Sequence, residues 1–207
     1  LSSIILIFDD NFFLSGSFIL LGALFDFLDG LAARFLNAHS EFGKQLDSFS
    51  DFVTFGIAPS MILFKLFSSI NISFPLIICF LFPMCAAIRL SKFNIDNKQQ
   101  NGFIGLPTPA AGIFVAAISL NYSQTNIFNN ELLLVTISIL LPLLLVSNIR
   151  FFSLKIKKGE NKKSKENIFR IALIISTIII LLSTFSFVAI PFIVILYLIL
   201  SIINNLI

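Results

Sequence analysis

Charged residues are scarce in this sequence, and their scarcity argues against an ordinary soluble domain. Only 12% of the 207 residues are charged and 57% are hydrophobic, with a mean hydropathy of +0.99. Soluble domains have roughly 25% charged and 45–50% apolar residues. Apolar stretches long enough to cross about 30 Å of hydrocarbon recur along the whole length and leave no room for a separate soluble domain. We therefore interpret residues 1–207 as a single domain of an integral membrane protein.

Strand-like alternation, reactive cysteine clusters and a signal peptide are also missing. The apolar runs are too long and unbroken for the alternating pattern of an outer-membrane barrel, so an all-α membrane protein is expected. Cys79 and Cys85 lie in one apolar segment, where thiols usually behave as small hydrophobic groups, which disfavours disulfide or metal roles. No signal peptide is evident at the start.

The apolar runs predict a polytopic helical bundle with about seven transmembrane helices. Their ranges are 12–32, 47–68, 74–90, 107–121, 131–149, 169–186 and 187–206. The range 107–121 is short and begins "LPTPAAG", which predicts a helix that starts inside the protein. Pro191 is expected in the first turns of the last span.

Basic residues gather in alternate loops between these spans. They occur as Arg34 and Lys44, then Arg89, Lys92 and Lys98, then eight more over 150–170, which leaves Lys65 alone on the other side. The positive-inside rule therefore places these loops in the cytoplasm and the protein in an inner, cytoplasmic membrane. The segment 150–170 is interpreted as an orientation signal, with attraction to anionic lipid headgroups as the alternative. A net charge of only +3 argues against nucleic-acid binding.

Four of the eleven acidic residues stand in one regular pattern: Asp26, Asp29, Asp47 and Asp51. On a helix, the first pair shares a face with Gly22, Gly30 and Arg34, and the second pair follows Gly43 at steps of four. Each pair thus lies beside glycines that open the same face to a ligand.

Carboxylates in a membrane are costly unless they are paired or bound to metal, and they are functional candidates by default. Four together repel one another, and Arg34 and Lys44 cannot neutralise them all. An all-oxygen site suits Mg²⁺ or Mn²⁺ rather than zinc or copper. Two such ions would form a clamp suited to phosphoryl chemistry. The alternative is that these acids cap helices or pair with the two nearby basic residues.

The segment "DFLDGLAARFLNAHSEFGKQLDSFSD" matches the pattern D-x2-D-G-x2-A-R-x8-G-x3-D-x3-D at every fixed position. This pattern is the signature of the CDP-alcohol phosphatidyltransferase family, which the sequence resembles over about residues 10 to 155. The segments "SFSDFVTFGIAPS", "RLSKFN", "GLPTPAAG" and "VSNIRFFSLK" resemble the phosphatidylserine synthase branch. The departure is at the front, where the family's first membrane helix is short or truncated.

The resemblance implies that an alcohol attacks the lipid-side phosphorus of CDP-diacylglycerol and that CMP leaves. It implies that two Mg²⁺ or Mn²⁺ ions are held by Asp26, Asp29, Asp47 and Asp51, that Asp51 is also the general base, and that Asp29, Gly30, Arg34 and Ser40 contact the CDP group. The chemistry agrees, because Gly30 lacks a side chain and permits close approach, and Arg34 offers a forked donor to phosphate. The resemblance also implies a homodimer among membrane lipids.

L-Serine is the acceptor that the resemblance favours. A serine zwitterion needs a cationic partner for its carboxylate and acceptors for its ammonium group, and Arg89, Asn94 and Arg150 are candidates at cytoplasmic helix ends. Glycerol 3-phosphate or an inositol phosphate is the alternative acceptor and would recruit extra basic residues. A cation carrier and a non-catalytic lipid-binding scaffold are further alternatives, although a carrier favours acids spread along a pathway near mid-membrane.

Overall fold

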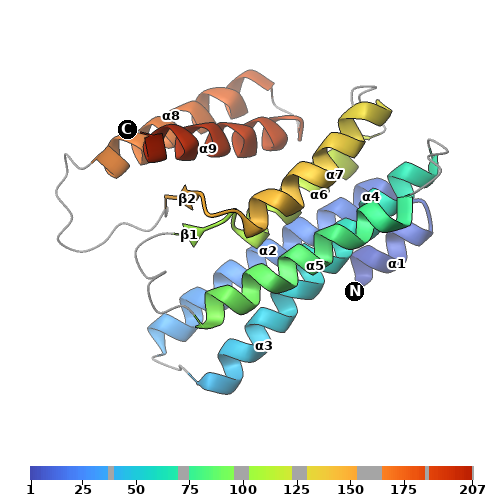
Figure 1. Ribbon diagram of the computed structural model, residues 1–207, viewed down its shortest axis with the longest axis horizontal. Helices are drawn as coiled ribbons and strands as arrows, with labels where there is room; N and C mark the ends of the chain where they lie inside the picture. Colours follow the sequence, from blue (N-terminus) through green and yellow to red (C-terminus); the bar gives the residue numbers. More distant parts are fainter. Residues whose placement is uncertain are drawn as a thin grey trace.

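A computed structural model describes residues 1–36, 40–69, 75–95, 103–122, 130–152, 165–184 and 187–206, and these residues are mostly helical (Figure 1). The elements are α1 (Ser2–Phe8), α2 (Phe12–Phe35), α3 (Glu41–Phe52), η1 (Val53–Ile57), α4 (Ala58–Ser69), α5 (Pro75–Ile95), β1 (Phe103–Ile104), α6 (Thr108–Asn121), α7 (Glu131–Val146), β2 (Arg150–Phe151), α8 (Lys165–Thr184) and α9 (Ala189–Leu206). The predicted all-α class is confirmed, with one two-stranded ribbon added.

Two predicted boundaries differ from the structure for local reasons. The helix predicted from residue 47 begins at Glu41, because Ser40 adopts an extended conformation and its hydroxyl accepts a hydrogen bond from the Gly43 amide at 3.0 Å. The span predicted to end at residue 149 stops at Val146, since the chain there turns into β2.

Two stretches of helix are long and apolar enough to cross a membrane among the residues that the structure describes. They are Phe12–Ala33 and Glu41–Ser69, whereas α6 and α7 have 14 and 16 residues, fewer than the roughly 20 of a full crossing. Large apolar side chains are exposed on the helix surfaces, such as Phe25 on α2 and Ile179 on α8, and a soluble monomer rarely exposes so many. The chain is thus a membrane protein, and the seven-span arrangement stays a prediction.

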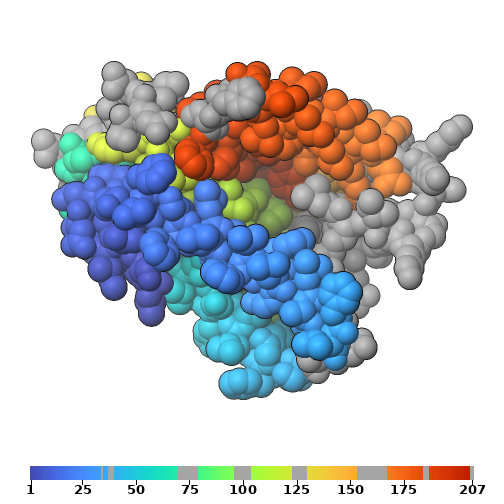
Figure 2. Space-filling model, turned by 180° about the vertical axis from the view of Figure 1, so that it is seen from behind, coloured from blue at the N-terminus to red at the C-terminus, as the bar shows by residue number. Residues whose placement is uncertain are grey.

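Helix α6 is the centre of the bundle, as its short and internal character predicts. Most of its side chains are buried, and it packs against α2, α4, η1 and α9. From behind, α2 and the α8–α9 pair flank it (Figure 2). The contact with α2 is close, since a Cβ at Gly16 would lie 2.6 Å from the carbonyl oxygen of Ala116.

The helix Glu41–Ser69 contains a π-helical segment, η1, in its middle. Pro59, in the first turn of α4, has no amide hydrogen and its ring clashes with the carbonyl of the residue four positions earlier, Phe55. The amide of Ala58 instead donates to the carbonyl of Val53, five residues back. Such π-segments often occur at functional sites.

A small antiparallel ribbon, β1 with β2, joins the start of α6 to the end of α7. Phe103 pairs with Phe151 and Ile104 with Arg150. Gly105 follows with a φ of +79°, and a side chain there would collide with the carbonyl oxygen of Leu145. Glycine is therefore required where the ribbon passes closest to α7.

Candidate active site

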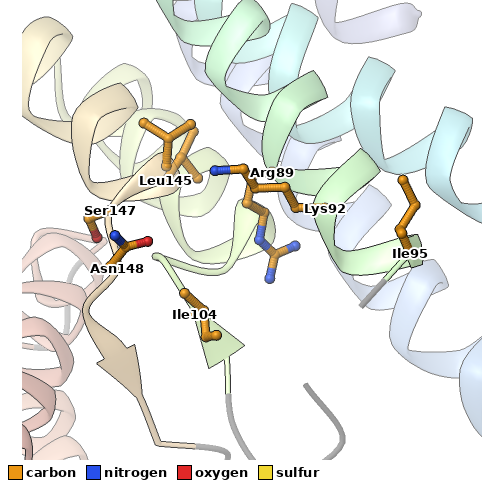
Figure 3. A pocket seen from close by; sticks show the side chains of 8 residues that line it. Arg89, Lys92, Ile95, Ile104, Leu145, Ser147 and Asn148 are labelled. Atoms are coloured by element: carbon orange, nitrogen blue, oxygen red, sulfur yellow. The ribbon is translucent and has the colours of Figure 1, made fainter. Parts of the chain in front are cut away.

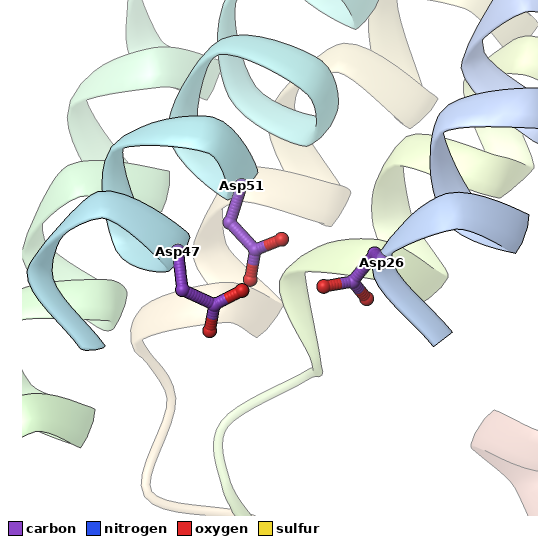
Figure 4. A group of neighbouring side chains, drawn as sticks. All are labelled: Asp26, Asp47 and Asp51. Atoms are coloured by element: carbon purple, nitrogen blue, oxygen red, sulfur yellow. The ribbon is translucent and has the colours of Figure 1, made fainter. Parts of the chain in front are cut away.

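Three aspartates from two helices converge at one end of the bundle. Asp26 comes from α2, and Asp47 and Asp51 come from successive turns of α3 (Figure 4). Each offers a carboxylate oxygen, and these oxygens all lie within 4.8 Å of one another. We call these residues the acidic triad. Its all-oxygen donor set fits a hard divalent cation, which would also relieve the repulsion between the carboxylates.

A close approach of α2 to η1 brings the triad together. A Cβ at Gly22, one turn before Asp26, would lie 2.6 Å from Cγ2 of Thr54. Gly22 is therefore a packing residue, which corrects the prediction that it opens its face to a ligand. Gly43 likewise lies against its own helix cap, since a Cβ there would be 3.1 Å from the Ser40 hydroxyl oxygen.

Gly30 is the glycine of this motif that faces open space. A Cβ at this position would meet no atom within 4 Å, so the side of α2 beyond the triad has room for a ligand. Asp29 is exposed nearby and lies outside the close group of carboxylates. The side chain of Arg34 lies outside the described part of the structure, and Ser40 is occupied as the cap of α3.

Arg89 is the predicted acceptor residue that interacts with a carboxylate of the triad. It is buried at 6% exposure on α5, donates a hydrogen bond to Oγ1 of Thr108 at 3.0 Å, and lies over the ring of Phe93. Its guanidinium is close enough to Asp51 for an electrostatic interaction. The hydrogen bond to Thr108, the first residue of α6, thus holds the positive charge of Arg89 beside Asp51.

The other two predicted acceptor residues have different surroundings. The Asn94 amide donates to the Ser48 hydroxyl at 2.8 Å, and its backbone carbonyl accepts a bond from Lys44 at 3.1 Å. Asn94 therefore joins α5 to α3. Arg150 is exposed in β2, opposite Ile104.

A pocket of about 330 Å³ opens between the end of α5 and the end of α7 (Figure 3). We call it the α5–α7 pocket. It is lined by Arg89, Lys92, Ile95, Ile104, Leu145, Val146, Ser147 and Asn148. Its volume suits a small ligand. Ser147 and Asn148 were not predicted as site residues, although they belong to the segment "VSNIRFFSLK", which resembles the phosphatidylserine synthase branch.

The opposite end of the bundle carries an ion pair between Lys65 at the end of α4 and Asp10 before α2, with nitrogen and oxygen 3.0 Å apart. Lys65 is the basic residue that the positive-inside rule places on the side opposite the three basic loops. Most of the basic segment 150–170 lies outside the described residues.

Comparison with known proteins agrees with the predicted resemblance. Residues 1–140 match the family model described as CDP-alcohol phosphatidyltransferase. The Bacillus subtilis CDP-diacylglycerol–serine O-phosphatidyltransferase is 42% identical over 148 residues, which are 71% of this chain and 79% of that protein. The Methanocaldococcus jannaschii protein of the same name is 39% identical over 66% of this chain and 63% of its own length. The archaetidylserine synthase of Methanothermobacter thermautotrophicus is 35% identical over 72% of this chain and 62% of its own length. With the family model covering most of its length and the acidic triad assembled from the signature, this chain belongs to the CDP-alcohol phosphatidyltransferase family.

Proposed function

We propose that this protein transfers the phosphatidyl group of CDP-diacylglycerol to L-serine, giving phosphatidylserine and CMP. The observation that carries the proposal is the acidic triad, which α2 and α3 assemble from the family signature beside the α5–α7 pocket. The names of the relatives, which include serine O-phosphatidyltransferases from bacteria and an archaeon, support serine as the acceptor.

Asp26, Asp47 and Asp51 would hold Mg²⁺ or Mn²⁺, with Asp29 completing the set from the exposed side of α2. When bound, the ions supply positive charge that stabilises the pyrophosphate oxygens during transfer. Asp51 is the proposed general base, because it is the triad member that interacts with Arg89, and Arg89 lines the pocket proposed for the acceptor.

The two substrates would enter from different sides of the triad. The open space at Gly30 would admit the CDP group, with Arg34 and Asp29 beside it and Ser40 nearby. The α5–α7 pocket would receive serine, since the Arg89 guanidinium suits a carboxylate and the oxygens of Ser147 and Asn148 suit an ammonium group. Arg150 and Asn94 would not contact serine directly. Asn94 would act by holding α5 against α3, and Arg150 as part of β2.

The alternative acceptors and the carrier receive less support. The names of the relatives specify serine, and Arg89 and Lys92 are the basic residues that line the α5–α7 pocket, one of which suffices for the single carboxylate of serine. A carrier needs acids along a path, whereas the triad is one cluster at the end of the bundle.

The test is CMP release by the purified full chain in detergent micelles with CDP-diacylglycerol and a panel of alcohols, with and without chelator. We expect release with serine, loss of release with EDTA, and recovery with Mg²⁺ or Mn²⁺. Asp51→Asn should lower the rate by at least about 100-fold, whereas Asp9→Asn, at the exposed end of α1, serves as the matched control. CMP release with glycerol 3-phosphate instead of serine would contradict serine as the acceptor. The absence of CMP release with every alcohol in the panel would contradict the proposed enzymatic activity.

We also propose the finer topology. The three basic loops would face the cytoplasm with the triad, and the shorter helices would complete seven spans in a cytoplasmic membrane. Since α9 packs on α6 and β2, the chain would act as one domain. A homodimer is expected from the resemblance, and its mass in detergent would test it.

A further inference from the structure

The last two helices lie beyond the residues that match the family model, yet one of them reaches the candidate active site. The family match ends at residue 140, whereas α8 and α9 cover Lys165–Leu206. Helix α8 packs on α9, and α9 packs on α6 and on β2. In Figure 1 the pair lies across the ribbon side of the bundle. Helix α9 is therefore the link between this last helix pair and the ribbon.

Tyr197 makes the contacts of α9 with the end of the ribbon. Its hydroxyl donates a hydrogen bond to the backbone carbonyl of Phe152 at 3.2 Å. Its ring packs edge-on against the Phe152 ring, with centroids 5.2 Å apart, and lies 5.9 Å from the ring of Phe151. Both phenylalanines are buried. The tyrosine thus holds β2 by one directional bond and two aromatic contacts.

The position of the ribbon in turn sets the position of residues that line the α5–α7 pocket. β2 pairs with β1, whose Ile104 lines the pocket, and Ser147 and Asn148 lie three and two residues before Arg150, the first residue of β2. After Ile104, the Gly105 amide donates to the carbonyl of Ile149 at 2.9 Å.

The same segment then enters α6, where Thr108 accepts the hydrogen bond from Arg89. The wall formed by Ile104 and the wall formed by Ser147 and Asn148 therefore depend on the position of the ribbon.

We propose that Tyr197 is a positioning residue for the acceptor: by fixing β2 it sets the distance between the ribbon side of the α5–α7 pocket and Arg89. The acceptor part of this inference rests on the proposed transfer to serine. Helices α8 and α9 then support the acceptor side of the site, and they do so through the hydroxyl of Tyr197.

The test compares Tyr197→Phe with Tyr122→Phe in the full chain. Each variant removes one hydroxyl and keeps its ring, and Tyr122 bonds the hydroxyl of Ser69 at 2.9 Å at the other end of the bundle. We expect Tyr197→Phe to raise the KM for serine about three- to tenfold, as the loss of one hydrogen bond allows. The KM for CDP-diacylglycerol and the melting temperature should stay close to those of Tyr122→Phe, whose serine KM should be unchanged.

Hydrogen exchange of the amide of Gly105 gives a second readout that needs no turnover. We expect faster exchange in Tyr197→Phe than in Tyr122→Phe and the unaltered chain. Unchanged exchange together with an unchanged serine KM would overturn the inference, as would equal effects of the two variants. Faster exchange in a chain that releases no CMP with any alcohol would support the contact and overturn the proposed function.

Discussion

Replacing Gly22 by alanine should push α2 away from η1 and so pull the acidic triad apart. A Cβ there would lie 2.6 Å from Cγ2 of Thr54, about 0.8 Å less than the 3.4 Å at which ordinary contact begins. Such overpacking typically costs about 1–3 kcal/mol. Because Asp26 lies one turn further along α2, it moves with the helix, and a displacement of about 1 Å at a reacting site can cost about 100-fold in rate.

A double-mutant cycle with Thr54→Ser isolates this contact. Serine lacks Cγ2, and the next atoms of Thr54, Cβ and Oγ1, lie 3.9 Å from the added methyl position. The gain in helix propensity from glycine to alanine, roughly 1 kcal/mol, is the same in both backgrounds and cancels. We expect a coupling free energy of about 1–2 kcal/mol for unfolding in mixed micelles, with CMP release recovered in the double variant.

The matched control is Gly30→Ala, because a Cβ there meets no atom within 4 Å. This variant should raise the unfolding free energy by up to roughly 1 kcal/mol, the gain in helix propensity without any clash, and should raise the KM for CDP-diacylglycerol. A coupling energy of zero between positions 22 and 54, with CMP release unaffected by Gly22→Ala, would refute the reasoning that this helix contact builds the triad.

Three further substitutions test separate parts of the frame. Ser40→Ala should lower the unfolding free energy by about 1 kcal/mol through loss of the α3 cap, while Ser40→Asp should keep it, as thermal unfolding would measure. Gly105→Ala should destabilise by at least about 1–3 kcal/mol and raise the KM for serine, because its φ of +79° and the carbonyl of Leu145 leave no place for a side chain; unchanged melting would contradict this. Lys65→Ala should cost at most about 1 kcal/mol and leave CMP release unchanged, since its ion pair with Asp10 is partly exposed and far from the triad, and a salt titration of the melting temperature would check it.

The helices and the acids could be predicted from the sequence because both depend on short, regular spacings. Apolar runs set the helix positions to within a few residues, and steps of three and four placed Asp26 on one face and Asp47 and Asp51 on another. That the two faces meet was inferred from the matching register of the two pairs and from the resemblance, and repulsion between the acids indicated bound cations. The packing that makes them meet, through Gly22 and Thr54, has no local pattern in the sequence.

The remaining features depend on contacts between distant segments. The two-residue strands are too short for any periodicity, so the ribbon beside the α5–α7 pocket could not be predicted. Asn94 was a reasonable candidate for acceptor binding by chemistry, but its amide bonds Ser48, which lies 46 residues away. Tyr197 looked like an ordinary residue of an apolar span, and only the fold places it against Phe152.

The π-segment η1 fixes the relative rotation of the two halves of the helix that contains it. Each residue of an α-helix advances the side-chain direction by about 100°, and a π-turn holds one residue more than an α-turn. Deleting a single residue from Val53–Ile57 would leave α4 seated in the core and swing the preceding half through about that angle. Asp47 and Asp51 would then point away from α2. The number of residues between the carboxylates and the buried half of this helix is therefore as much a requirement of the site as the carboxylates themselves.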